Sequence, residues 1–385
     1  MSSLVLQLLG GCLDDCSTGA PALDGVCVND ADAEVDTAET GDTGDSGVGE
    51  WTVCAAGGAP YDSIQDAIDA AVSGDEITVC PGSYPGFDVS AKDLIVRGAG
   101  PGESVVDGGA ETAISVVGSN FRLRGFSIRS RSTDTKKAAC VHVESSTGTV
   151  EEVTLFGSLT PGSLAHQEES SVRWLDIVAE DNEAGKVLSG QRGTLTLRHS
   201  VFRRNTGYYG DGGTLLELLG SDYEIANNIL HNNETSATAS AGHFGAPAEG
   251  FGWVYNNVWW GNDHHGAAYL LASEGDVRLV NNVVNATVGG GILASTANSD
   301  GLLYNSSYGN SGEDWVTERD GEIPATNLSE DCWLVSPLSG DFSLNEGYSP
   351  CVDAGHPDYG YNDQADATRS DIGAFGGPLG VWSPR

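Results

Sequence analysis

The stretch that decides the fold is Tyr255-Asn256-Asn257-Val258-Trp259, because similar stretches return along the second half of the chain. The others are Leu197-Arg198-His199-Ser200-Val201-Phe202, Ala226-Asn227-Asn228-Ile229-Leu230, Val280-Asn281-Asn282-Val283-Val284 and Tyr304-Asn305-Ser306-Ser307-Tyr308. Each is a short apolar strand interrupted by one or two small polar residues. With weaker earlier copies, the anchor positions are 98, 125, 152, 176, 200, 228, 257, 282 and 306, an average step of 26 residues over 208. A period of this size indicates a solenoid, in which each coil buries its apolar face against the next.

The composition of the repeats indicates which kind of solenoid. A leucine-rich repeat has a similar length, but its Leu-x-x-Leu-x-Leu frame and helical half are missing. β-branched and aromatic residues alternate instead, with Gly, Asn, Ser and Asp at the corners, which predicts several short strands per coil. The repeats resemble the right-handed parallel β-helix proteins of the pectin-lyase-like class, in which Asn side chains stack as ladders at a tight bend. Stacked amides can hydrogen-bond along the axis, and Asn tolerates the left-handed backbone of a corner.

This resemblance covers residues 51 to 378 and implies an all-β fold, a single-stranded right-handed parallel β-helix solenoid. Residues 61–71 form the one good helix signal, with Asp62 or Ser63 as the cap and an apolar stripe. Residues 61–84 resemble the opening of pectinesterase-type β-helices, which implies a helix over the first coil. Residues 349–355 and 369–378 resemble the closing segment of bacterial secreted β-helices. We therefore expect one domain over 51–385, with an N-terminal cap at 51–76 and a C-terminal cap at 332–385.

The first fifty residues differ from the rest. Leu9-Gly10-Gly11-Cys12 resembles a bacterial lipobox, which implies that 1–12 is a signal segment and that Cys12 is lipidated. A basic n-region is absent and the apolar run is short, so an ordinary apolar start stays open. Residues 13–50 are acidic and of low complexity, and we expect a disordered linker. The expected location is the bacterial cell surface, as an outer-membrane lipoprotein, or the extracellular space.

Charge restricts the partners. The net charge of -37 is expected to repel nucleic acid and anionic membrane, so that only the lipid anchor would reach a membrane. It also disfavours polyanionic sugars unless a divalent cation bridges. Residues 97–204 are the exception, because they hold thirteen of the eighteen basic residues and thirteen acids. These middle coils are the only place where an anionic group would be tolerated. The chain is expected to be a monomer.

Cysteine usage indicates an oxidising compartment. If Cys12 is lipidated, three local pairs suggest themselves, and Cys140 is left over. The expected disulfides are Cys16 with Cys27, Cys54 with Cys80, and Cys332 with Cys351. A zinc site is not indicated, since no Cys-x-x-Cys pair occurs. Asp363, Asp366 and Asp371 could bind Ca²⁺, although their spacing is not that of an EF-hand and a polar cap is the simpler interpretation.

The repeat register predicts a pair of stacked acids. Glu234 and Asp263 lie six residues after anchors 228 and 257, so they are expected one strand spacing apart, about 4.8 Å. That is close to the ~5 to 5.5 Å between the carboxyl groups of retaining glycosidases. Arg204 is expected within reach, and His264 follows directly. Glu234, Asp263, His264 and Arg204 are therefore the candidate catalytic residues.

Aromatic and polar residues crowd the same region. One of Trp259 and Trp260 is expected to face outward as a sugar-stacking platform, because neighbours on a strand point to opposite faces. The other candidate binding residues are Tyr209, His243 and Asp211. The simpler interpretation is that the aromatics belong to the core and the acids are solvated. No motif of pectinesterases, polygalacturonases or pectate lyases has a counterpart in the chain.

Two functions therefore stay open. The first is a surface β-helix that binds or displays, with a polysaccharide or cell-surface glycan as partner and without turnover. The second is a polysaccharide-active enzyme, a glycoside hydrolase, lyase or epimerase that uses Glu234 and Asp263. The fold cannot decide between them, since one scaffold hosts many chemistries.

Overall fold

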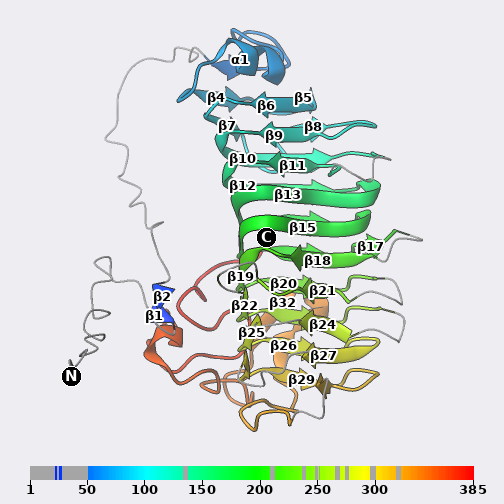
Figure 1. Cartoon of the computed structure of the whole chain (residues 1–385), viewed down its shortest axis with the longest axis vertical. Helices are drawn as coiled ribbons and strands as arrows, with labels where there is room; N and C mark the ends of the chain where they lie inside the picture. Colours follow the sequence, from blue (N-terminus) through cyan, green and yellow to red (C-terminus); the bar gives the residue numbers. More distant parts are fainter. Residues whose placement is uncertain are drawn as a thin grey trace, which may run out of the picture.

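The chain winds into one long solenoid of parallel strands, with the helix α1 at one end (Figure 1). The structure is a computed structural model that describes residues 22–23, 26–27, 51–132, 138–208, 213–235, 240–247, 250, 252–264, 269–273, 277–294, 301–317 and 322–385. The predicted right-handed parallel β-helix with a short N-terminal helix is confirmed. Within the described residues, no helix has the length and apolar character that crossing a membrane requires.

Each coil contributes strands to three parallel sheets. The first sheet contains β3 (Thr52–Val53), β4 (Glu76–Val79), β7 (Leu94–Gly98), β19 (Asp222–Ala226), β22 (Gly252–Tyr255), β25 (Val277–Val280) and β28 (Leu302–Leu303). The second contains β5 (Gly82–Pro85), β8 (Ser104–Asp107), β14 (Val178–Glu180), β16 (Val201–Arg203), β20 (Ile229–His231), β23 (Val258–Trp260), β26 (Val283–Asn285) and β29 (Ser306–Tyr308). The third contains β6 (Phe87–Ser90), β9 (Ile114–Val117), β11 (Val141–Glu144), β18 (Thr214–Leu219), β21 (Gly242–Phe244), β24 (Tyr269–Ser273), β27 (Gly290–Ala294) and β30 (Trp315–Thr317).

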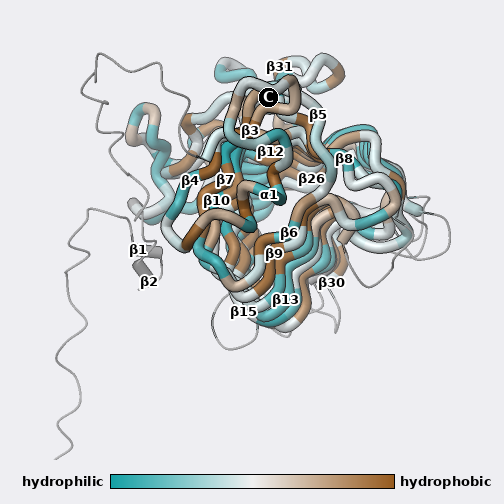
Figure 2. Tube along the Cα trace, turned by 90° about the horizontal axis from the view of Figure 1, so that it is seen from above, coloured by the Kyte–Doolittle hydropathy of each residue, from teal (hydrophilic) through white to brown (hydrophobic). Residues whose placement is uncertain are grey.

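Four long strands bend around corners and take part in two sheets. β10 (Asn120–Arg129) and β12 (Thr147–Phe156) run from the first sheet into the second. β13 (Leu159–Leu175) and β15 (Glu183–Arg198) run from the third into the first, and β17 (Thr206–Gly207) pairs with the start of β15. Figure 2 looks at the solenoid from above and shows the coils lying over one another. Because side chains alternate along each strand, one set fills the interior and the other covers the outside.

A ladder of amides fixes the corner between the first and second sheets. Asn257 Oδ1 accepts from the backbone N–H and the side-chain amide of Asn228, each at 2.9 Å. Asn282 receives the same pair of bonds from Asn257, and Asn305 from Asn282. The predicted vertical stacking of Asn228, Asn257 and Asn282 is thus confirmed. Because each of these ladder amides bonds to the next coil, the register at this corner is held without a buried charge.

Two further ladders occupy the other corners. Asn182, Asn205, Asn233 and Asn262 stack between the second and third sheets through bonds of 2.8–3.4 Å. Serines stack at the third corner, where the N–H of Ser119 donates to Ser146 and that of Ser146 to Ser170. The left-handed backbone falls on the residue before the first ladder, for example Asn227, Asn256 and Asn281. Asn is tolerated there because its short polar side chain lowers the cost of this conformation.

The predicted register was wrong by one residue at several anchors. Ser306 pairs with Val283, so Asn305 and not Ser306 stacks on Asn282. Val178 pairs with Val201, which places Ile177, not Asp176, above Ser200. At these coils the corner lacks the double Asn that marks the ladder, and the coil is only 23 residues long. The predicted anchors therefore fall one residue away from the positions that stack.

The first coil is closed by α1 (Ile64–Ala70). Ser63 caps it by accepting from the N–H of Asp66 at 3.3 Å, as one of the two predicted caps. Ile64, Ala67 and Ile68 are buried against the coil below. Lys92 Nζ donates to the carbonyls of Ile68 and Ala71, so a cation satisfies the C-terminal carbonyls. The helix therefore shields apolar side chains that the first coil would otherwise expose.

Two of the three predicted disulfides are present. Cys54 bonds to Cys80 and Cys332 to Cys351. Cys16, the predicted partner of Cys27, and the lipidation site Cys12 lie outside the described residues. Within the 13–50 segment, the structure describes only the antiparallel pair β1 (Ala22–Leu23) and β2 (Val26–Cys27). Cys140 is a buried free thiol, and burial raises its pKa to about 12.

The C-terminal segment runs back along the side of the lower coils (Figure 1). It includes the antiparallel pair β31 (Leu334–Ser336) and β32 (Asp341–Leu344) and the short 3-10 turns η2 (Pro337–Ser339) and η3 (Tyr359–Tyr361). The side-chain amide of Asn227 donates to the carbonyls of Ala374 and Gly376, and that of Asn256 to Asp371. The corner residues that precede the ladder thus hold this segment against the solenoid.

Candidate functional site

The predicted acidic pair is stacked on the outside of the solenoid. Glu234 forms a parallel bridge to Asp263, and Thr206 precedes Glu234 in the same column. Glu234 is exposed and Asp263 is half-buried. Backbones in adjacent parallel strands are about 4.8 Å apart, so the bridge places Glu234 and Asp263 as neighbours along the axis, as the register predicted. The pair is therefore available to solvent, which a catalytic or ligand-binding pair requires.

His264 does not join the pair. Its side chain is fully buried, because residues 263 and 264 point to opposite faces of the strand. Gly289 on the next coil leaves the room that the ring needs, since a Cβ there would lie 2.7 Å from the His264 Nε2. The assignment of His264 as a catalytic residue was therefore wrong: it is an interior side chain.

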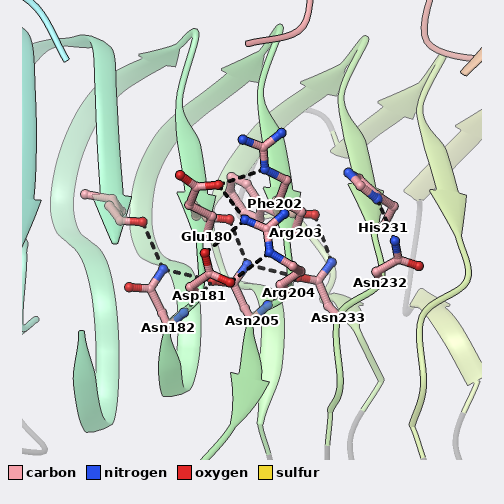
Figure 3. Close-up of polar contacts among 12 residues, drawn as sticks. Glu180, Asp181, Asn182, Phe202, Arg203, Arg204, Asn205, His231, Asn232 and Asn233 are labelled. Atoms are coloured by element: carbon pink, nitrogen blue, oxygen red, sulfur yellow. Dashed lines mark hydrogen bonds and ion pairs between the residues drawn. The ribbon is translucent and has the colours of Figure 1, made fainter. Parts of the chain in front are cut away.

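Arg204 points away from the acidic pair. Figure 3 shows its guanidinium turned to the preceding coil, where it bonds Glu180 and Asp181 at 2.8 Å each. Arg203 bonds Glu180 as well, at 2.8 Å. The hydrogen bond from Arg204 lowers the pKa of the Asp181 carboxyl. Arg204 is thus engaged by two acids above it, and the prediction that it reaches Glu234 was wrong.

A hollow of about 520 Å³ nevertheless adjoins this network. Its charged lining consists of Arg131, Asp181, Glu183 and Arg204. Thr206 also lines it, and the next residue down that column is Glu234. The stacked acids therefore lie one and two coils beyond the lined part of this hollow, and the side chains predicted to complete the site do not converge there.

The predicted aromatic platform is covered. Trp259 is fully buried, with its ring edge against Phe244 at 6.5 Å. Trp260 faces outward as expected, but Phe342 of β32 packs on it with ring centroids 6.2 Å apart. Trp259 is therefore unavailable to a sugar, and the half-buried Trp260 is partly covered by Phe342. His243 is half-buried on the third sheet, and Tyr209 and Asp211 lie outside the described residues.

A larger open groove crosses the outer face of the first sheet in the upper coils, and the sequence reasoning did not identify it. Its volume is about 690 Å³. The polar lining is Asp93, Asn120, Arg122, Thr147, Thr149, Ser171, Arg173, Thr194 and Thr196. The alternation of polar residues at 120, 122 and 124, repeated at 147, 149 and 151, is the sequence signal that could have revealed it. The groove lies within the middle coils where an anionic group was expected to be tolerated.

Parallel pairing arranges these residues in two columns. Arg122 pairs with Thr149, Thr149 with Arg173, and Arg173 with Thr196. Arg122 and Arg173 are thus two strands apart, about 9.6 Å along the axis. The second column contains Asn120, Thr147, Ser171 and Thr194. Two guanidinium groups therefore alternate with hydroxyls along a surface that runs parallel to the solenoid axis.

The groove carries more positive than negative charge. Its lining includes Arg122 and Arg173 against the single acid Asp93. Arg122 bonds Glu151 at 2.7 Å, and Arg124 bonds Glu152 at 2.9 Å, so nearby acids hold the guanidinium groups in place. The hydrogen bond from Arg124 lowers the pKa of the Glu152 carboxyl. In a chain of net charge -37, this is a local exception.

The same columns continue in the lower coils but are covered there. Glu224 follows Thr196, and Trp253 follows Glu224. Arg198 donates to both carboxylate oxygens of Glu224 at 2.9–3.0 Å, and both residues are about 8% exposed. Tyr255 donates to the same carboxylate beneath Tyr361 of the C-terminal segment. The open groove therefore ends where this segment begins to cover the sheet.

The acids of the C-terminal segment bind backbone groups. Asp363 accepts from the N–H groups of Asp371 and Gly377, and burial raises the pKa of Asp363 to about 7. Asp366 accepts from Thr368, and Asp371 from the N–H of Asp353. Among the described residues, no three acids, histidines or cysteines are arranged to hold a metal ion. These carboxylates serve as caps of local turns here.

Comparisons with known proteins concern the fold. No model of a protein family matches the chain, and no curated protein matches it. The parallel β-helix fold is shown by the structure of the chain itself. A pectate lyase Pel9A structure has a TM-score of 0.45 at 13% identity and covers 84% of this chain and 95% of that one. A pectin methylesterase in complex with a hexasaccharide has a TM-score of 0.36 at 11% identity, and the match covers 77% of this chain and 98% of that one. The A-module of the mannuronan C-5 epimerase AlgE4 of Azotobacter vinelandii has a TM-score of 0.26 at 14% identity, and the match covers 70% of this chain and 96% of that one.

Proposed function

We propose that this β-helix binds an acidic polysaccharide strand along the open groove of its first sheet. The observation that carries the proposal is the outward column Arg122, Thr149, Arg173 and Thr196 in that groove. A guanidinium group matches the two oxygens of a carboxylate, and hydroxyls and amides match sugar hydroxyls. The columns run along the axis, so they suit an extended polymer.

Charge distribution supports an acidic rather than a neutral ligand. Residues 205–385 carry twenty-four acids and four arginines, and they would repel a polyanion. Most of the groove lies in the stretch 97–204, where basic and acidic residues are equal in number, and Asp93 is its one lining residue with a negative charge. An acidic strand is therefore repelled less by these coils than by the lower ones, and Arg122 and Arg173 offer it partners in the groove. Binding should weaken as salt is added, because exposed charges are screened.

The test is a titration with oligogalacturonate. The variant Arg122→Gln/Arg173→Gln should bind at least tenfold more weakly than the parent. The matched control is Arg203→Gln/Arg204→Gln, which removes the same charge from another face, and it should bind normally. An equal loss in both variants would show that only net charge matters, and equal binding of a neutral glucan would show that the groove does not select acids.

The second candidate is a polysaccharide-active enzyme that uses Glu234 and Asp263. It is favoured by their stacking on adjacent strands at the solvent-accessible surface of the solenoid. The separation suits two carboxyl groups that share one glycosidic bond. Assays for reducing ends and for unsaturated products distinguish the enzyme from the binding protein. The variants to compare with the parent are Glu234→Gln and Asp263→Asn. Products that disappear in both variants support the enzyme, whereas binding without products supports the first proposal.

The surface location remains a proposal that rests on the Leu9-Gly10-Gly11-Cys12 motif. Lipidation of Cys12 with an acidic linker would hold the groove away from the membrane. Labelling cells with a fatty-acid analogue tests it: the parent should carry the label and the Cys12→Ser variant should not. Label in both, or in neither, would contradict the anchor.

A further inference from the structure

The outer face of the third sheet carries a column of polar and titratable side chains that the proposed function does not use. Parallel pairing stacks Ser115, His142, His166, Ser189, Glu217 and His243 in this order. They lie on a different sheet from the open groove. Each coil contributes one residue to this column, so the column cannot be recognised from the sequence of any single strand.

Hydrogen bonds join three of the side chains in this region. His166 Nδ1 lies 2.8 Å from Ser189 Oγ, and Ser189 Oγ lies 2.8 Å from Ser163 Oγ. The rings of His142 and His166 stack with their centroids 5.8 Å apart and fix the orientation of the imidazole. An imidazole within hydrogen-bond distance of a serine hydroxyl is the arrangement that activates a serine nucleophile.

The surroundings favour a neutral imidazole. Burial, followed by the charge of His142, lowers the pKa of His166. The charge of Glu168 opposes this shift and that of Lys186 adds to it. Lys186 itself is paired with Glu217. A neutral Nδ1 without a proton can accept one from the Ser189 hydroxyl, whereas an imidazolium cannot. Ser189 is almost fully buried, while Ser163, His166 and Lys186 are half-buried and border it.

We propose that Ser189 and His166 form a nucleophile and base that cleave a small acyl ester. Ser189 Oγ attacks the acyl carbon, and His166 takes the hydroxyl proton. The bond from the acyl carbon to the alcohol oxygen breaks, and that oxygen receives the proton from His166. Water then adds to the acyl-serine with His166 as base, releases the carboxylic acid and restores the Ser189 hydroxyl. Because Ser189 is almost fully buried, we expect only a small acyl group to reach its Oγ.

The test is labelling by diethyl p-nitrophenyl phosphate, followed by peptide mass spectrometry and by assay of p-nitrophenyl acetate hydrolysis. The parent should carry the phosphoryl group on Ser189. Label and hydrolysis should both be lost in Ser189→Ala and His166→Gln, while Ser163→Ala, the matched serine, keeps the label. Thermal unfolding checks that each variant is folded. A parent that is not labelled, or is labelled on Ser163 instead, would overturn the proposal.

A second variant keeps the proposal testable if Ser189→Ala fails to fold. In Ser189→Cys, the introduced thiol should react with iodoacetamide faster than the buried thiol of Cys140, which serves as an internal reference. Adding His166→Gln should slow the introduced thiol and leave Cys140 unchanged. Equal rates at both thiols, or no effect of His166→Gln, would mean that the hydrogen bonds only satisfy buried hydroxyls.

Discussion

The upper and lower coils of the first sheet share the same outward columns, yet they differ in what covers them. In the upper coils, Arg122, Thr149 and Arg173 line an open groove. In the lower coils, the same column continues with Glu224 and Trp253. Tyr361 and Leu379 of the C-terminal segment pack in one cluster with Trp253 and the neighbouring Tyr255. Coils with the same backbone path can therefore differ in whether their outward side chains are exposed to solvent. Function therefore depends on where the covering segment stops.

The largest expected difference between the two halves concerns their ion pairs. Glu224→Gln leaves Arg198 buried without a counter-charge, and we expect a loss of about 3 to 5 kcal/mol in the free energy of unfolding. The control is Glu151→Gln in the groove, where the partner Arg122 is 40% exposed and the loss should be below about 1 kcal/mol. Urea unfolding measures both. Equal losses would show that the lower pair is not shielded as described.

A smaller effect is expected from the phenol beneath the C-terminal segment. Tyr255→Phe removes the hydroxyl that donates to Glu224 and keeps the ring contact with Tyr361. We expect a loss of about 1 to 2 kcal/mol, because a buried carboxylate loses one donor. Double-mutant analysis with Glu224→Gln should show coupling, since both residues act on one carboxylate. Strict additivity would contradict the shared hydrogen bond.

The smallest effect is expected at the boundary between the two halves. Trp382 stacks on His199 with ring centroids 5.4 Å apart, and Arg385 bonds the carbonyl of Asp176. Removing residues 382–385 should cost about 1 kcal/mol. Burial lowers the pKa of His199, so the shortened chain should show a higher pKa for this imidazole by NMR titration. An unchanged pKa would mean that other residues bury the ring.

Much of the fold was accessible from the sequence because its signals are local and periodic. The spacing of the double Asn motifs predicted the stacking of Asn228, Asn257 and Asn282, and the same register placed Glu234 beside Asp263. Cys54 and Cys80 end similar phrases one coil apart, and they form a disulfide. The register failed by one residue where the corner has no double Asn, as at Ser306.

The site was less accessible because it depends on non-local contacts and on side-chain direction. The sequence suggested that one of Trp259 and Trp260 faces outward, but nothing in it showed that Phe342, far along the chain, would cover Trp260. Arg204 has acids on the coils before and after it, and its guanidinium pairs with Glu180 and Asp181 on the preceding coil. The polar alternation in 120–124 was visible, but its exposure depends on the path of the C-terminal segment.

Hydroxyl-radical footprinting with and without oligogalacturonate tests the central claim most directly, namely that the open face of the upper coils is the binding surface. The account predicts protection in the peptides that carry residues 94–97, 120–124, 147–151 and 171–175, with no change around 203–206 and 234–263. Protection centred on Glu234 and Asp263, or no protection on the first sheet while the ligand is bound, would contradict it.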